Sequence, residues 1–257
     1  LRLLTMNHRI RRYETCDSTN ERALCALDKG TGQHGDVLIA KEQSQGRGRQ
    51  GSVWWSAPAG GLYLSMIWRP KQAINAVCLT LAGGLAALDC AQLSGLDRCL
   101  LKWPNDLMVG DKKLAGVLVE TRGLEPSQPR YVIGIGLNVG QESFPTDLQQ
   151  EREVTSLAQE GIDSCLAEAE EHLIKALDQR LEQAARTPSS LGEDFLTASQ
   201  LAGARVEVHS GNQVHRGRLL KLEFEFDLDS EPVLCLETAP GVVTRLVAAH
   251  ISALHSR

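Results

Sequence analysis

Apolar side chains alternate along one stretch of the chain and run continuously along another, and both patterns predict strands. From Gly61 to Trp68 every second side chain is large and apolar, so these side chains share one face. Residues 131–139 are apolar at nearly every position, which is typical of a central strand buried on both faces. Residues 98–120 give a strand, a tight turn and a second strand, with Gly110-Asp111 as the expected hairpin turn.

Helical patterns occupy much of the remaining sequence. Residues 75–93 are rich in Ala and Leu without a period of two, which predicts a buried helix. Gly83 and Gly84 weaken such a helix intrinsically but permit close packing against a sheet. Further along, we expect an N-cap at Asp163 before a helix with leucines at helical spacing, and a second helix around residues 191–201.

The character of the chain changes at Gly203, where short segments of alternating apolar and polar residues begin. The alternation is clearest at Leu222, Phe224, Phe226 and Leu228. Short strands at close spacing predict a small antiparallel barrel. We therefore expect two domains, residues 1–202 and residues 203–257.

The composition is that of a folded protein with no general affinity for nucleic acid. Hydrophobic residues make up 42% of the chain and the formal net charge is −5, whereas non-specific binding to phosphates needs an excess of Lys and Arg. The seven cysteines form no C-x-x-C pair and lack zinc-site spacing, so we expect reduced thiols in a cytoplasmic protein and no structural metal. The longest apolar stretch, residues 73–88, is too short to span a bilayer, and no membrane partner is expected.

The stretch GRGRQGSV, residues 46–53, fits both a dinucleotide-binding turn and a kinase glycine loop. The first interpretation fails because Gly51 is followed by SVWWSAPAGG, which cannot open a helix promptly. A kinase would need V-A-I-K, H-R-D and D-F-G, and these motifs are missing from the sequence, as is a Walker A lysine. What remains is a flexible loop whose Arg47 and Arg49 suit a carboxylate or a phosphate, with a solvated turn as the alternative.

Four other segments place polar or charged residues at strand ends or turns. DSTNERA sets three polar residues, 18–20, at a strand-to-helix junction, where an ordinary N-cap is the alternative. KWPND, residues 102–106, presents a cation and a carboxylate on a turn, and its alternative is a turn with solvated charges. KKLAGVLVE puts Lys113 on an apolar strand, where it points into a cleft or is exposed at an edge. GIGLNV sets Asn138 at the end of a central strand, where ligand-facing groups of open sheets often lie.

In this order, the four segments and the loop resemble the biotin protein ligases, also called biotin–[acetyl-CoA carboxylase] ligases. The motifs that carry the resemblance are EQSQGRGRQGSVWWS, LKWPNDL, KLAGVLVE and IGIGLNV, and it extends from Tyr13 to about Leu181. It implies an α+β fold in which helices flank a mixed central sheet, as in class II synthetases, followed by a small SH3-like barrel. Because only about a dozen residues precede Tyr13, we expect a monofunctional ligase without a DNA-binding domain.

The resemblance also implies the activity and the partners. Biotin protein ligases use ATP with Mg²⁺ to convert biotin to biotinoyl-5′-adenylate and pyrophosphate, and then transfer biotin to one lysine of a biotin carboxyl carrier domain. The first step brings a carboxylate against a polyphosphate, so cations must offset the repulsion and the charge that develops. The mixed anhydride is reactive, so water must be excluded. Exposed strand edges suit either a homodimer or docking of the carrier, and no DNA partner is expected.

Site residues follow from the motif positions that the resemblance matches. Positions matching the biotin pocket are Ser18, Thr19, Asn20, Gln43, Gly46, Arg47, Gly48, Arg49, Lys113 and Gly116. Positions matching the ATP or adenylate site are Arg47, Arg49, Trp54, Lys102, Lys113 and Asn138. The catalytic roles fall to Lys113, Arg49 and Asp106, and Asp106 is a candidate to accept a proton from the acceptor lysine.

The chain departs from the family pattern in two places. Loop positions that are basic in some members are here Gln50, Ser52 and Val53. The stretch GQESFPTDLQQEREVTSL lacks the tryptophan that covers the adenine in some members, and Phe144 is its candidate replacement. In the predicted barrel, the candidate contacts to ATP or the carrier are His215, Arg216 and Arg245.

Two alternative functions are open. A lipoate or octanoate ligase or transferase shares this fold and its chemistry, but a fatty chain cannot satisfy the polar partners that a ureido group needs. A non-catalytic biotin-binding regulator would use the arginine loop alone, although Lys113, Arg49 and Asp106 together favour an enzyme.

Overall fold

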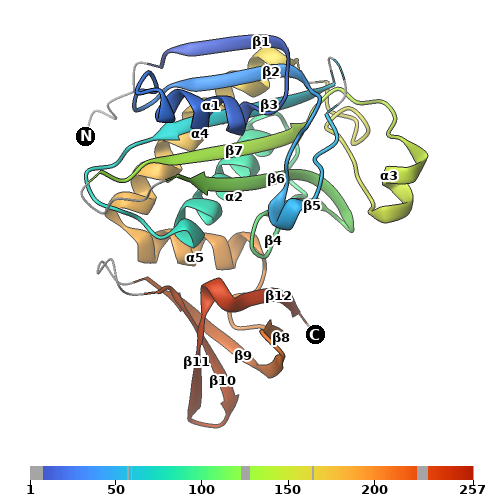
Figure 1. Ribbon diagram of the computed structural model, residues 1–257. Coiled ribbons are helices and arrows are strands. Elements are labelled where there is room, and N and C mark those ends of the chain that lie inside the picture. Colours follow the sequence, from blue (N-terminus) through green and yellow to red (C-terminus); the bar gives the residue numbers. More distant parts are fainter. Residues whose placement is uncertain are drawn as a thin grey trace.

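The computed structural model describes residues 8–56, 58, 60–122, 128–163, 165–224 and 231–256. Its larger part is a seven-stranded sheet with the strand order β1-β2-β3-β7-β6-β5-β4 (Figure 1). The strands are β1 (Ile10–Cys16), β2 (Val37–Gln43), β3 (Gly61–Trp68), β4 (Leu100–Lys102), β5 (Asp106–Val109), β6 (Lys112–Thr121) and β7 (Tyr131–Asn138). Only β1 and β2 run parallel, and every other neighbouring pair is antiparallel, which confirms the predicted mixed sheet.

The strands predicted from apolar patterns lie where the patterns place them. β3 covers Gly61–Trp68, and β7 is the middle strand of the sheet. The predicted hairpin joins β5 to β6 through Gly110, whose positive φ of 57° is a conformation that glycine adopts without strain.

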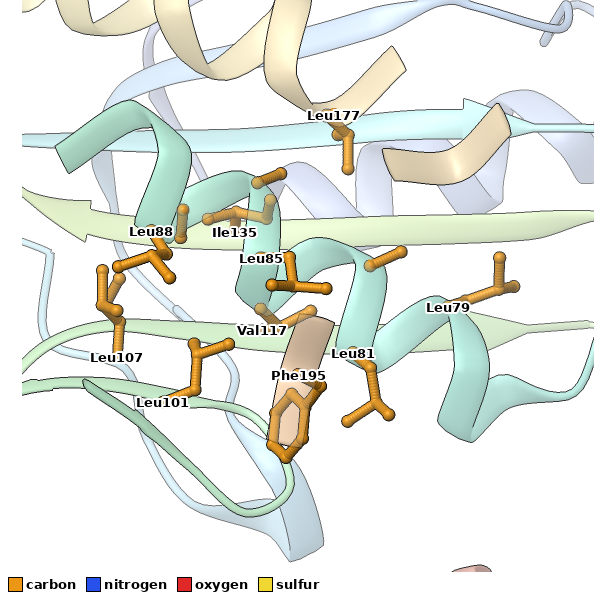
Figure 2. Close-up of a cluster of buried hydrophobic side chains, with 14 of the residues drawn as sticks. Leu79, Leu81, Leu85, Leu88, Leu101, Leu107, Val117, Ile135, Leu177 and Phe195 are labelled. Atoms are coloured by element: carbon orange, nitrogen blue, oxygen red, sulfur yellow. The ribbon is translucent and has the colours of Figure 1, made fainter. Parts of the chain in front are cut away.

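Helices cover both faces of this sheet. The covering helices are α1 (Thr19–Asp28), α2 (Ala76–Leu93), α4 (Leu166–Arg186) and α5 (Pro188–Ala198), whereas the short α3 (Thr146–Glu151) has no buried residue. α1 packs Leu24 and Leu27 against Leu38 and Ile67 of the sheet. On the other face, α2 lies between the strands and the pair α4 and α5 (Figure 2). The side chains labelled in that view are Leu79, Leu81, Leu85, Leu88, Leu101, Leu107, Val117, Ile135, Leu177 and Phe195.

α2 is a core helix, although its composition resembles that of a membrane span. Among the described helices it alone has the length and hydropathy for crossing a bilayer, and 72% of its 18 residues are buried inside the protein. Its N-cap is Asn75, whose side chain accepts a hydrogen bond from the N–H of Val77 at 2.8 Å. A Cβ on Gly83 would lie 2.7 Å from Cγ1 of Val117, so the missing side chain lets the helix approach β6 closely.

The start of α4 differs from the sequence expectation. The predicted N-cap at Asp163 is wrong, because the helix begins at Leu166 and Cys165 is the N-cap. The sulfur of Cys165 accepts a hydrogen bond from the N–H of Glu168 at 3.4 Å, so a thiol takes the place that a carboxylate was expected to fill. The following helix, α5, begins at Pro188, a few residues before its predicted start.

The C-terminal part is a five-stranded antiparallel sheet with the order β11-β10-β9-β8-β12. Its strands are β8 (Arg205–Ser210), β9 (Gln213–Glu223), β10 (Val233–Ala239), β11 (Val242–Val247) and β12 (Ile251–Ser256). Within the described ranges no ladder joins β11 to β12, so this sheet has the SH3-like strand content expected but is not closed by hydrogen bonds. Leu222 and Phe224 are buried as the alternation predicts, whereas Phe226 and Leu228 lie outside the described residues.

The small sheet is attached to the large one beneath the KWPND turn. The indole N–H of Trp103 donates to the carbonyl oxygen of Ile251 at 3.1 Å, and the Trp103 ring meets Phe195 edge-on at 5.9 Å. One continuous hydrophobic core therefore runs from the large sheet through α5 into the small sheet. The division into domains at residues 202 and 203 stays a prediction.

Candidate active site

One cavity of about 270 Å³ lies over the carboxyl-terminal half of β7 and the start of β6, under the loop 46–54. The residues from the sequence prediction that line it are Ser18, Thr19, Asn20, Gln43, Arg47, Gly48, Arg49, Trp54, Asp106, Lys113 and Gly116. They come from the start of α1, the end of β2, the arginine loop and two neighbouring strands. Segments that are far apart in sequence thus share one cavity.

Hydroxyl and amide groups make up one end of the cavity. Gln43 Oε1 accepts hydrogen bonds from the N–H and the hydroxyl of Thr19 at 2.8 and 3.1 Å. Its Nε2 donates to the hydroxyl of Ser56 at 2.9 Å. Ser18 is the N-cap of α1, but its side chain makes no capping hydrogen bond. Ser18 thus stands at the N-cap position, as the alternative interpretation expected, but its buried side chain lines the cavity and does not cap the helix.

Asn20 joins this polar end to the arginine loop. Its Nδ2 donates to Glu120 Oε2 at 2.8 Å, and the same oxygen accepts a hydrogen bond from Arg47 Nη2 at 2.9 Å. Asn20 occupies its place because residue 134 of β7 is glycine: a Cβ there would lie 2.1 Å from Asn20 Oδ1. The carboxylate of Glu120 thus holds a pocket side chain and a loop side chain in one arrangement.

The arginine loop is folded back on itself. Gly48 N–H donates to the carbonyl of Ser52 at 2.7 Å, and Trp54 N–H donates to the carbonyl of Gly46 at 3.0 Å. A Cβ on Gly46 would lie 2.3 Å from the carbonyl oxygen of Trp54, so the closed form of the loop requires glycine there. Gln50 has a φ of 54°, a left-handed conformation that is uncommon for a residue with a side chain.

The two loop arginines have different partners. Arg47 Nη1 lies 3.2 Å from Glu21 Oε2, in addition to its contact with Glu120. Arg49 Nη1 donates to the neutral side-chain oxygen of Asn105 at 3.3 Å. Arg47 is therefore held by two carboxylates, whereas the charge of Arg49 is not balanced by a paired acid among the described residues.

Trp54 lies on a floor of glycines. Its ring atoms are within 2.9 Å of where a Cβ would stand on Gly116, and within 2.4 Å of where one would stand on Gly136. Lys113 Nζ lies 5.3 Å from the centroid of this indole, within cation–π range. The missing side chains at these two positions of β6 and β7 thus provide the space that the indole of Trp54 occupies close to the lysine.

Lys113 and Asp106 form an ion pair inside the cavity. Lys113 Nζ is 2.6 Å from Asp106 Oδ1, and their side chains are 15% and 25% exposed. A register shift between Leu107 and Met108 of β5 interrupts the regular ladder beside β6 at this place. The backbone of Lys113 also forms hydrogen bonds with a second segment. Its N–H donates to the backbone carbonyl of Glu153 at 2.9 Å, and its carbonyl accepts from the backbone N–H of Thr155 at 3.0 Å.

Three predicted site residues lie outside this cavity. Lys102 is exposed at the end of the edge strand β4, although it pairs in register with Asp106. Gly46 is buried and lines a neighbouring cavity instead. Asn138 is buried and donates to the carbonyl of Thr155 at 2.9 Å, and it lines a small adjoining cavity of about 20 Å³. Phe144, the candidate cover for the adenine, lines that same small cavity and meets the ring of Trp55 edge-on at 5.5 Å.

Several cavity residues escaped the sequence prediction. They include Tyr63, Asn105, Gly134, Gly136, Arg152 and Ser252. The alternating glycines of IGIGLN carried a signal, because residues two apart in a strand share a face. Ser252 of β12 brings the small sheet to the cavity, whereas the three barrel candidates do not line it: His215, Arg216 and Arg245.

The chain belongs to the Biotin/lipoate A/B protein ligase family, whose sequence model matches residues 13–138. It is 34% identical to the biotin--[acetyl-CoA-carboxylase] ligase of Mycobacterium tuberculosis over 235 residues, which are 88% of this chain and 82% of that protein. The bifunctional ligase/repressor BirA of Salmonella typhimurium is 38% identical over 147 residues, covering 57% of this chain. That match spans only 45% of the Salmonella protein.

Solved structures of biotin protein ligases have the same fold. The enzyme of Aquifex aeolicus in complex with biotin and ATP superposes with a TM-score of 0.76 at 25% identity, over 96% of this chain and 99% of that chain. The enzyme of Leishmania major in complex with biotinyl-5-AMP gives a TM-score of 0.61 at 25% identity, over 92% of this chain and 98% of that chain.

Proposed function

We propose that this protein is a biotin protein ligase, which joins biotin to ATP as biotinoyl-5′-adenylate and then transfers biotin to a lysine of a carrier domain. The observation that carries this proposal is that one cavity has hydroxyl and amide groups at one end and cations at the other. The relatives named for biotin ligation and the neighbour holding biotin and ATP support the same substrates.

The polar end suits the ureido ring of biotin. A ureido group has two N–H donors and a carbonyl acceptor, and Ser18, Thr19 and Asn20 offer hydroxyl and amide groups that match them. A lipoyl or octanoyl chain has no such groups and would gain no hydrogen bond at this polar end, where Thr19 and Asn20 already bond to Gln43 and Glu120. Biotin is therefore the preferred substrate over a fatty acid.

The cationic end suits the carboxylate of biotin and the α-phosphate of ATP. In the first step the carboxylate oxygen attacks the α-phosphorus and pyrophosphate leaves. Lys113 and Arg49 offset the repulsion between the two anions and the charge that develops on the phosphate. Mg²⁺ commonly enters such sites with the nucleotide on one carboxylate, and Asp106 is the acidic side chain that lines the cavity among the described residues.

In the second step the amine of the carrier lysine attacks the activated carbonyl and AMP leaves. The amine must lose a proton, and Asp106 is the group proposed to accept it. The loop 46–54 screens the mixed anhydride from water. The proposed partner is a biotin carboxyl carrier protein. An exposed sheet edge suits either docking of this carrier or a homodimer. We further propose that the protein binds no DNA and works in the cytoplasm.

The proposal is tested by giving the purified protein ATP, Mg²⁺ and either biotin or lipoate, and measuring pyrophosphate release. Addition of an apo-carrier domain, followed by mass spectrometry, then detects transfer. We expect release and a carrier mass increase with biotin only. Release with lipoate alone would favour the lipoate ligase, and binding of biotin without release would favour the non-catalytic regulator.

A further inference from the structure

Arg152 is fixed beside the strand that carries Lys113. It follows α3 directly as its C-cap residue, with extended backbone. The next residues join β6 through the two backbone hydrogen bonds from and to Lys113, which form an isolated parallel bridge between Lys113 and Val154. The side chain of Arg152 lines the main cavity, although Arg152 belongs to no motif recognised in the sequence.

Arg152 is one of four cationic side chains that line the cavity in the described part of the chain. Two of them are balanced at close range, since Lys113 pairs with Asp106 and Arg47 pairs with two glutamates. Among the residues that the structure describes, the acidic partner of Arg152 is its sequence neighbour Glu151, at 3.9 Å, and that glutamate is 71% exposed. A pair so long and so exposed to water contributes little, and the charge of Arg152 remains available to an anion.

The position of Arg152 indicates which anion. Arg152 lines both the main cavity and the small adjoining cavity that contains Trp55, Phe144 and Asn138. The hydroxyl and amide groups at the polar end line only the main cavity. If biotin occupies the polar end, as the proposed function requires, Arg152 stands on the side left for the nucleotide.

We propose that Arg152 is a nucleotide-binding residue that contacts the phosphate groups of ATP. This inference rests on the proposed function for the identity of the nucleotide. A guanidinium donates two parallel hydrogen bonds to a phosphate and stays charged, so Arg152 supplies, together with Arg49, the positive charge that the paired cations do not. Its positive charge also compensates for the charge that the loop lacks at Gln50 and Ser52, two positions that are basic in some members of the family.

The test compares Arg152→Gln, Arg152→Lys and a matched control, Lys112→Gln. Lys112 is exposed on the same strand as Lys113, and its replacement changes the net charge equally. The measurements are the KM values for ATP and biotin in pyrophosphate exchange, and the dissociation constants of tripolyphosphate and adenosine. Arg152→Gln should raise the ATP KM and the tripolyphosphate constant about tenfold, with Arg152→Lys in between. Binding of biotin and adenosine, and all values for Lys112→Gln, should change less than about twofold.

Two results would overturn the inference: unchanged tripolyphosphate binding in Arg152→Gln, or an equal loss for adenosine, which would assign the side chain to the base. Failure of the proposed function is distinguishable. If the wild-type protein forms no adenylate but its tripolyphosphate binding still depends on Arg152, the anion contact stands and the ligase does not. If the wild-type protein is active and Arg152→Gln behaves like Lys112→Gln, the ligase stands and the contact does not.

Discussion

Lys113 Nζ and Asp106 Oδ1 are 2.6 Å apart on neighbouring strands, within a cavity that also receives the arginine loop. The pair keeps each charge compensated before ligands bind. When an anionic ligand enters, the amine gains a second acceptor and the carboxylate gains the option of holding a metal ion or a proton. One ion pair thus stands where the proposed mechanism needs a cation in one step and a base in the next.

Replacing Lys113 by alanine should abolish adenylate formation. Loss of a cation directed at developing phosphate charge costs a factor of at least about 100 in rate. The fold should persist, because the side chain packs in a cavity and its partner Asp106 keeps contact with solvent. The measurements are pyrophosphate exchange and urea denaturation, with exposed Lys112→Ala as the control. Turnover at the wild-type rate would remove Lys113 from the mechanism.

Replacing Gly134 by alanine should weaken biotin binding. The new Cβ would stand 2.1 Å from Asn20 Oδ1, so Asn20 must leave its place and lose its 2.8 Å hydrogen bond to Glu120. We expect the dissociation constant of biotin to rise about tenfold or more, and the free energy of unfolding to fall by about 1–3 kcal/mol.

The control for this substitution is Gly140→Ala, just beyond the same strand. A Cβ on Gly140 meets nothing closer than the carbonyl oxygen of Gly60 at 3.8 Å, an ordinary contact. Calorimetric titration with biotin compares the two variants. Equal affinities would mean that Asn20 does not contact the ligand.

Much of the fold followed from local patterns. The strand at Gly61–Trp68, the central strand that begins at Tyr131 and the long apolar helix each bury most of their side chains, so period and composition sufficed to predict them. The N-cap of α4 could not be read in this way. Both Asp163 and Cys165 can accept a hydrogen bond, and packing of the helix decides which of them stands at its start.

The site was predictable where its residues lie within motifs, and not where they are brought in by distant pairing. Arg49 and Lys113 both belong to motifs quoted from the sequence, and both line the same cavity. Arg152 and Ser252 reach the cavity through tertiary contacts, a bridge to β6 and the anchoring of β12, that leave no periodic trace in the sequence. Lys102 shows the converse, because it belongs to a motif but its exposed side chain does not line this cavity, and its role at the nucleotide stays a prediction.

His8 should make stability depend on pH. Its ring lies 2.8 Å from both Asp178 Oδ2 and the carbonyl oxygen of Gly35, and the hydrogen bond to Asp178 raises the pKa of His8 above its usual 6.5. A raised folded-state pKa stabilises the protein fully below the unfolded value, and this contribution is lost as pH rises through the folded value.

The pH effect is measured as a difference between His8→Gln and the wild-type protein. Urea denaturation at about pH 5.5 should show a larger loss of unfolding free energy in the variant than at about pH 8.5. Burial lowers the pKa of the nearby His34, which has the opposite effect on stability. His34 is present in both proteins, and its burial, the largest cause of the lowered pKa, does not involve His8. A loss that is the same at both pH values would show that the ion pair contributes nothing.

The adjacent glycines of α2 should respond in opposite directions to alanine. A Cβ on Gly83 would stand 2.7 Å from Cγ1 of Val117, a buried side chain of β6 with little room to move, so Gly83→Ala should lower the unfolding free energy by about 1–3 kcal/mol. A Cβ on Gly84 meets Leu101 at 3.4 Å, an ordinary contact, so Gly84→Ala should gain up to about 1 kcal/mol from helix propensity. Thermal and urea denaturation compare the two variants. Equal destabilisation would mean that α2 does not approach β6 through Gly83, because both substitutions add the same methyl group to the same helix.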